Sequence, residues 1–177
     1  REMIDETLAK FTEGDLLLLQ NEINEIPYLM ESGHARGMKI CFNPAPFTSE
    51  VQDYPLHTLD ILVVNEVEGS GLSGVQEAQA ILQTLAPRFP EAQILLTLGE
   101  QGAWYRSPLE TFEVPAKRVC AVDTTAAGDT FIGYFLAELA AGGSASQAIE
   151  RATRATAICV TRPGAMDSIP AASELVG

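Results

Sequence analysis

Short apolar runs alternate with helix-like periodicity along most of this chain. The runs are bounded by turn residues and predict strands over about residues 15–20, 39–43, 59–65 and 93–98. Apolar residues at three- and four-residue spacing predict helices over about residues 1–11, 26–36, 75–85, 128–141, 146–160 and 171–176. Strands alternating with helices of this length favour an α/β fold with a mainly parallel sheet and helices on both faces, in three α/β/α layers.

Two further segments refine this arrangement. Residues 16–19 are all leucine, a run typical of a strand that is covered on both faces. Residues 104–106 and 112–114 flank the Ser107-Pro108 dipeptide and predict a hairpin.

The length of 177 residues fits a single α/β domain spanning residues 1–177. The chain opens on a helical pattern without an initiator methionine, so we expect it to be part of a longer protein.

The charge balance limits the partners of this chain. A net charge of −13 argues against nucleic acid and against an anionic membrane surface. It leaves a nucleotide open, because backbone amides and metal ions can hold phosphates. The sequence has neither a secretory signal pattern nor an apolar run near the roughly 20 residues of a membrane span. We therefore expect a cytoplasmic setting.

The cysteines and histidines carry no metal-binding pattern. Cys41, Cys120 and Cys159 lie far apart without a CxxC pair, which predicts neither a disulfide framework nor a zinc site. Each cysteine is expected to be a small buried apolar residue. His34 and His57 have no partner at metal-ligand spacing and are expected at the surface.

The strongest chemical signal is the sequence VDTTAAGDTF at residues 122–131. Its small residues leave the backbone N–H groups at a helix start open, and the positive end of the helix dipole favours a phosphate there. Asp129, beside these amides, could accept a proton. Amides that bind an anion, next to a proton acceptor, are what phosphoryl transfer needs. The alternative is tight packing of a helix start, with Asp129 as a plain cap.

Polar or small residues follow the predicted strands, where parallel sheets bind ligands. They include Glu22 and Asn43, and we expect one shared site. Asn65 and Glu68 could order water around Mg²⁺, although a helix cap with solvated acids is the better explanation of this segment taken alone. The glycines in residues 97–102 permit either close backbone approach or a tight turn.

A second glycine-rich segment resembles a dinucleotide fingerprint only in its spacing. Residues 69–74 match GxGxxG, but four residues separate them from the preceding strand, and the fingerprint requires a tight strand-to-helix turn. An NAD-dependent oxidoreductase is therefore the weaker alternative. The chain has no GxxxxGK[ST] loop.

Together these motifs resemble the carbohydrate kinase family that includes ribokinase and fructokinase. Residues 123–131 resemble its C-terminal signature, residues 65–68 its NxxE motif and residues 97–102 its nucleotide loop. Residues 43–46 (NPAP) and 161–165 (TRPGA) add a likeness to ribokinase itself. The order and spacing agree over nearly the entire chain, from about residue 15 to residue 170.

The resemblance implies a role for each matching position. Asp129 would be the general base for the sugar hydroxyl, and the anion hole would be formed by the amides of Ala126, Ala127 and Gly128. ATP would be contacted by Asn65, Thr97, Gly99, Gly102 and Thr153. Glu68 would order water on Mg²⁺, and Glu22 would contact the sugar. A monovalent cation such as K⁺ would be held, partly through backbone carbonyls, by Asp123, Thr125, Cys159, Arg162, Gly164 and Ser168.

The family's N-terminal half, with its sugar-binding segment and β lid, has no counterpart in these residues. The expectation is therefore the C-terminal, nucleotide-binding portion of a ribokinase-like enzyme that transfers phosphoryl from ATP to a hydroxyl of a small sugar, foremost ribose. This portion alone is expected to be inactive. The alternatives are an inactive nucleotide-binding fragment and a kinase for another sugar, a ketodeoxy acid or a nucleoside. A homodimer of the full-length protein stays open.

Overall fold

The computed structural model describes residues 1–175, and these form two compact units. The first unit contains residues 1–98 and 104–112, and the second contains residues 99–103 and those from 113 onward. The helix expected over residues 171–176 has its last residue, Val176, outside the described residues.

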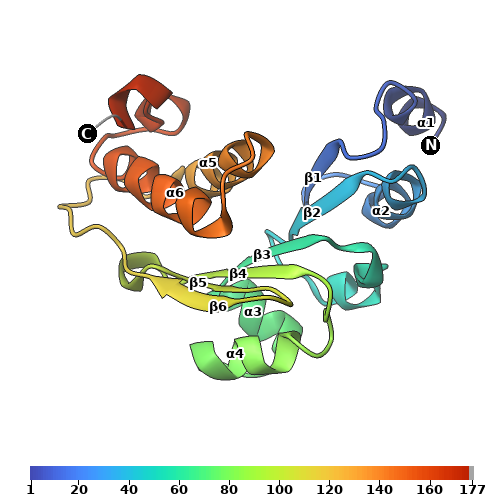
Figure 1. Ribbon diagram of the computed structural model, residues 1–177, viewed down its shortest axis with the longest axis horizontal. Helices are drawn as coiled ribbons and strands as arrows, with labels where there is room; N and C mark the ends of the chain where they lie inside the picture. The colour runs from blue at the N-terminus through green and yellow to red at the C-terminus, as the bar shows by residue number, and fades with distance from the viewer. Residues whose placement is uncertain (176–177) are drawn as a thin grey trace. The chain divides into compact units, whose positions relative to one another are not determined.

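Within residues 1–175, six strands form one sheet in the order β1-β2-β3-β4-β5-β6 (Figure 1). Their bounds are Leu16–Gln20, Lys39–Asn43, Ile61–Asn65, Gln93–Thr97, Ala103–Arg106 and Thr111–Val114. The pairs β1–β2, β2–β3 and β3–β4 are parallel. The turn between β5 and β6 is closed by Ser107, whose amide donates to the Glu110 carbonyl oxygen (2.8 Å). The α/β class, the parallel pairs and the hairpin are confirmed.

The first unit has its core on one face of the sheet. Buried strand residues on that face include Phe42, Leu62 and Leu96, and they pack with Met30 and Ile81 from the helices. These helices are α1 (Glu2–Leu8), α2 (Ile26–Ala35), α3 (Glu66–Ser73) and α4 (Ala78–Leu85), with the 3₁₀ turns η1 (Ser49–Asp53) and η2 (Leu56–Thr58). The buried apolar side chains thus hold β2, β3 and β4 in place, and with them the residues at the carboxyl ends of these strands.

Strand β1 differs from the prediction that it is covered on both faces. Leu19 is 4% exposed, but Leu16 and Leu18 are 39% and 42% exposed. The strand is the first in the sheet order, so it has a neighbour on one side, β2. Alternate side chains of a strand point to opposite faces, and one face of β1 is uncovered in the described residues.

The second unit is built on two helices, α5 (Ala127–Ala140) and α6 (Ala145–Cys159), which pack against each other. They bury Phe135 and Ile149 completely. Ser144 caps α6, because its hydroxyl accepts from the Gln147 amide while the Gln147 side chain accepts from the Ser144 amide. The 3₁₀ turns η3 (Gly99–Gln101), η4 (Met166–Ser168) and η5 (Ala172–Leu175) complete this unit.

Several local predictions need correction. Helix α4 begins at Ala78 rather than near residue 75, because the Glu77 carboxylate caps it by accepting from the amides of Gln79 and Ala80. The last predicted helix is a 3₁₀ turn.

The predictions of which cysteines and histidines are buried or exposed are right except for one cysteine. Cys120 is exposed rather than buried, whereas Cys41 and Cys159 are buried as expected. His34 and His57 are both exposed, as predicted. No helix in the described part of the chain has the length and apolar character to cross a membrane.

Candidate active site

Polar side chains meet where β1, β2 and β3 end, and we call Gln20, Asn43, Asn65 and Glu68 the strand-end network. Gln20 Nε2 donates to Asn43 Oδ1 (2.9 Å), and Asn43 Nδ2 donates to Glu68 Oε2 (3.0 Å) and to the Val63 carbonyl oxygen (3.0 Å). Gln20, Asn43 and Asn65 are the last residues of consecutive parallel strands. The parallel register therefore brings together residues that are far apart in the sequence.

Glu68 is the acceptor at the centre of this network. Its Oε2 accepts from the Asn65 amide (2.9 Å) as well as from Asn43, and its Oε1 accepts from Asn65 Nδ2 (2.9 Å). In return, Asn65 Oδ1 accepts from the Glu68 amide, which closes a capping box at the start of α3. Burial raises the pKa of Glu68, and the bonds from Asn65 and Asn43 oppose that shift.

The cap interpretation of Asn65 is thus right, but Glu68 is not a solvated acid, because only 6% of it is exposed. The described residues contain no group of three or more acidic, histidine or cysteine residues that could hold a metal ion. Mg²⁺ in phosphoryl-transfer sites usually takes one or two carboxylates, water and substrate phosphates. Glu68 Oε1 accepts one bond and so keeps a lone pair for a metal-bound water, which fits the water-mediated role.

The glycine-rich segment at residues 69–74 is part of helix α3, not a phosphate loop. A Cβ on Gly69 would lie 2.9 Å from the Ile81 side chain, and one on Gly71 would lie 2.4 Å from the Phe47 ring. Gly74 ends the helix in the left-handed conformation. Close packing and a helix cap therefore account for the GxGxxG spacing, and the oxidoreductase alternative loses its support.

The segment from Thr97 to Gly102 begins at the end of β4. Thr97 Oγ1 donates to the Val64 carbonyl oxygen at 3.5 Å, so this bond is long. Gly99 opens η3. Gly102 has φ +106, and a Cβ there would lie 2.1 Å from the Val114 carbonyl oxygen. Backbone packing alone therefore requires glycine at residue 102.

In the second unit, residues 122–130 form the turn into α5, which we call the α5 turn. The N-cap is Ala126, whose side chain makes no capping bond, and Asp129 is an exposed acid in the first turn of the helix. The Ala127 amide donates to the Thr124 carbonyl oxygen (3.1 Å). A Cβ on Gly128 would meet nothing within 4 Å, so this point of the turn faces open space. Asp129 is therefore not the N-cap of this helix.

Asp123 ties the α5 turn to the loop after α6. Its Oδ1 accepts from the amide (2.9 Å) and the hydroxyl (2.5 Å) of Thr125, and its Oδ2 accepts from the Gly164 amide (2.9 Å). The hydrogen bond from the Thr125 hydroxyl, followed by those from the amides of Gly164 and Thr125, lowers the pKa of Asp123. The Val160 carbonyl oxygen accepts from the amides of Val122 (2.7 Å) and Asp123 (3.2 Å). The lowered pKa keeps Asp123 ionised, and an ionised carboxylate could contribute a ligand to a monovalent cation.

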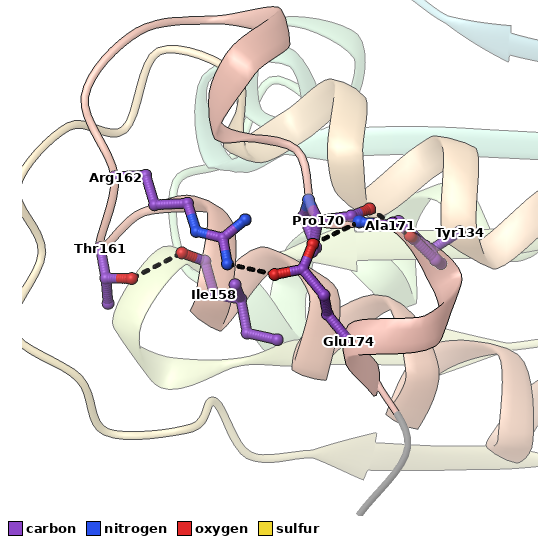
Figure 2. A network of polar contacts seen from close by, with 7 residues as sticks. All are labelled: Tyr134, Ile158, Thr161, Arg162, Pro170, Ala171 and Glu174. Atoms are coloured by element: carbon purple, nitrogen blue, oxygen red, sulfur yellow. Dashed lines mark hydrogen bonds and ion pairs between the residues drawn. The ribbon is translucent and has the colours of Figure 1, made fainter.

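The remaining residues implied for that cation lie between the last residue of α6, Cys159, and the last residue of η4, Ser168. Cys159 Sγ is 3.2 Å from Ser168 Oγ, and the Cys159 carbonyl oxygen accepts from the Arg162 amide (3.0 Å). Figure 2 shows the Arg162 side chain directed to Glu174, with which it forms an ion pair. Arg162 could therefore serve a cation only through its backbone.

The two remaining predicted residues differ in exposure. Thr153, on α6, is 6% exposed, and its buried hydroxyl has no partner within the described structure. Such an orphaned hydroxyl is a position where a bound group would supply the missing hydrogen bond. Glu22 is exposed in the loop after β1.

The chain matches the pfkB family carbohydrate kinase domain over residues 26–172. It belongs to the pfkB family of carbohydrate kinases. The match contains the strand-end residues Asn43, Asn65 and Glu68 and the whole α5 turn. The resemblance drawn from the sequence motifs is thereby confirmed.

Individual relatives of this pfkB chain are sugar kinases. It is 35% identical to ribokinase from Schizosaccharomyces pombe over 92% of this chain and 54% of the relative. A ribokinase from Cryptococcus neoformans var. grubii in complex with ADP has a TM-score of 0.81 and 30% identity, over 95% of this chain and 60% of that one. A double mutant of Vibrio cholerae fructokinase, bound to fructose, ADP and potassium ion, has a TM-score of 0.80 and 25% identity. That match covers 93% of this chain and 60% of the fructokinase chain.

The chain thus spans little more than half the length of these three relatives. The sequence anticipated Asn43, Asn65 and Glu68 as strand-end residues of one site, and it anticipated the α5 turn, but it did not single out Gln20. Gln20 is the last residue of the strand predicted over residues 15–20, so the signal that singled out Asn43, a polar residue at the end of a parallel strand, could have found it too.

Proposed function

We propose that the protein carrying this pfkB domain transfers the γ-phosphoryl group of ATP to a hydroxyl of a small sugar, foremost ribose. The observation that carries the proposal is the α5 turn, where the acid Asp129 follows the open Gly128 in the first turn of a fourteen-residue helix. The identity to ribokinases supports the choice of acceptor.

In this proposal Asp129 takes the proton from the attacking hydroxyl. The hydroxyl oxygen forms a bond to the γ-phosphorus as the bond to the bridging oxygen of ADP breaks. Charge on the transferred group would be stabilised by the amides of Ala126 and Gly128, and by that of Ala127 if its bond to Thr124 opens. Such a reaction depends mainly on positioning and on neutralising charge, which backbone amides and one base can supply.

The other roles are assigned residue by residue. Asn65, Thr97, Gly99, Gly102 and Thr153 would contact ATP, although packing alone explains Gly102. The orphaned hydroxyl of Thr153 supports its part in this set. Glu22, exposed after β1, would contact the sugar.

Two ions accompany the proposal. Mg²⁺ supplies charge neutralisation at the ATP phosphates, and Glu68 would hold one of its waters through Oε1. A monovalent cation, foremost K⁺, would lie by Asp123, Thr125, Gly164, Ser168 and the carbonyls near Cys159 and Arg162. The lowered pKa of Asp123 supports this assignment, because it keeps the carboxylate negative.

A second candidate is a domain that binds nucleotide without turnover. The chain's partial coverage of its relatives favours it for the 177 residues alone, and we propose that they are inactive by themselves. The complete gene product would be cytoplasmic and could be a homodimer.

The test measures ADP formation by the complete gene product with ribose, fructose, a ketodeoxy acid and a nucleoside, each with and without K⁺. The proposal predicts ATP-dependent turnover that is fastest with ribose and higher with K⁺. ATP binding without turnover on any acceptor would favour the second candidate. Preference for another acceptor would keep the kinase and change its substrate.

A further inference from the structure

A buried chain of polar side chains runs from the first turn of α5 to the loop after α6. It consists of Thr130, Cys159 and Ser168, which are 2%, 1% and 1% exposed. Thr130 Oγ1 donates to Cys159 Sγ (3.3 Å), and Cys159 Sγ lies 3.2 Å from Ser168 Oγ. Ser168 Oγ in turn lies 2.6 Å from the Ala165 carbonyl oxygen. Side chains from three separate segments are thereby joined in one line.

The direction of every bond in this chain follows from the number of protons available. The Ser168 hydroxyl has one proton and gives it to the Ala165 carbonyl oxygen, which can only accept. Ser168 Oγ must therefore accept from the Cys159 thiol, and the sulfur is left to accept from the Thr130 hydroxyl. Cys159 and Ser168 each both donate and accept, so the Cys159 side chain is a required link rather than an inert apolar filler.

The position of this chain relates it to the candidate chemistry. Thr130 directly follows Asp129, and Ser168 belongs to the same loop as Gly164, whose amide binds the Asp123 carboxylate. The loop is thus fixed to the start of the α5 turn through Asp123 and to its end through Cys159. Tyr134, one helical turn further along α5, also donates to the Pro170 carbonyl oxygen (Figure 2).

We infer that Cys159 is a positioning residue, whose thiol fixes the first turn of α5, and with it Asp129, to the loop formed by residues 160–168. The part of this inference that concerns turnover rests on the proposed kinase function. Cys159 acts through Thr130 and touches no substrate. Its role requires one donor and one acceptor at the γ position, which serine also has and alanine lacks.

The test compares Cys159→Ala with Cys159→Ser in the complete gene product. Alanine should lower kcat about tenfold, the size expected for one or two lost hydrogen bonds, while KM for ATP changes less than about twofold. Serine should restore kcat to within about threefold of the unaltered protein. Hydrogen exchange in the segment 126–132 should be about tenfold faster in the alanine variant and normal in the serine variant.

Cys41 supplies a matched control, because it is a second fully buried cysteine, in β2 between Ile40 and Phe42. Cys41→Ala removes the same atom from a core and should leave kcat and exchange in the segment 126–132 unchanged. At this apolar position serine should destabilise the protein more than alanine does, the reverse of the order at Cys159.

Two results would overturn the inference: unchanged exchange in Cys159→Ala, or serine no better than alanine at residue 159 in a folded protein. The exchange measurement needs no substrate. If the unaltered protein has no kinase activity, the proposed function fails while the exchange data still decide whether Cys159 fixes the α5 turn.

Discussion

The strand-end network and the α5 turn each contain a carboxylate that accepts backbone and side-chain hydrogen bonds. The pKa values of these two carboxyl groups are nevertheless shifted in opposite directions. Glu68 accepts from Asn65 and Asn43, and its pKa is raised. Asp123 accepts from Thr125 and Gly164, and its pKa is lowered. The donors are similar in kind, so the difference has another cause.

Burial decides the sign. Glu68, in the first turn of α3, is 6% exposed, and the loss of water around its charge outweighs the bonds that it accepts. Asp123 lies in a partly exposed turn, where the same loss is the smallest influence on its pKa. Glu68 therefore serves as a buried acceptor that holds Asn43 and Asn65 together, whereas Asp123 keeps its negative charge near the surface.

The largest expected difference between the two regions is in stability. Glu68→Ala removes the acceptor of Asn43 and of both donors of Asn65, and it should lower the unfolding free energy by about 3 kcal/mol. Glu66→Ala removes an exposed acid from the same turn of α3 and should change it by less than about 0.5 kcal/mol. Denaturant unfolding measures both. Equal losses would mean that the network adds nothing to stability.

The second difference is in the pH dependence of unfolding. Because the folded pKa of Glu68 lies above its unfolded value of about 4.3, its contribution to stability falls as pH rises from that value through the folded pKa. Because the folded pKa of Asp123 lies below about 3.9, its contribution is present above that value and is lost as pH falls through the folded pKa.

Unfolding curves of Glu68→Gln and Asp123→Asn, recorded from about pH 3 to pH 8 and subtracted from that of the unaltered protein, measure the two contributions. The Glu68 difference should decline with pH and the Asp123 difference should rise. Differences of the same sign would contradict the assignment of burial as the cause.

The smallest expected effect concerns the thiols. Cys120 is exposed, whereas Cys41 and Cys159 are buried, and burial raises the pKa of Cys41 to about 12. A thiol reagent at pH 8 should therefore modify Cys120 in the folded protein and the other two only after unfolding. Mass spectrometry of the modified peptides identifies the sites. Early modification of Cys159 would contradict its burial between α5 and η4.

The hydrophobic pattern alone was enough to predict the positions of β2, β3 and β4, because these strands are buried and end at polar residues. The pattern also located β1, but it did not predict that Leu16 and Leu18 are exposed, since a run of leucines does not reveal whether another segment covers each face. The motif at residues 65–68 predicted a helix cap, but it could not reveal that Glu68 is buried. That burial depends on Asn43, 25 residues earlier, and the parallel register brings the two together.

The α5 turn shows the same division between local and distant causes. Its small residues and the helix that follows were visible in the sequence, and the helix begins within one residue of the predicted position. The bond of Asp123 to Gly164 and the line from Thr130 to Ser168 join segments more than 35 residues apart. No local spacing encodes these contacts, because the packing of α5 on α6 creates them.

The most direct test of the account is turnover by the Asp129→Asn variant of the complete gene product. Asparagine keeps the shape of the side chain but cannot take the proton, so kcat should fall about 10²- to 10⁴-fold while ATP still binds. Asp53→Asn removes the same charge from an exposed position in η1 and should leave kcat unchanged. Near-normal phosphorylation of the sugar by Asp129→Asn would contradict the assignment of Asp129 as the general base.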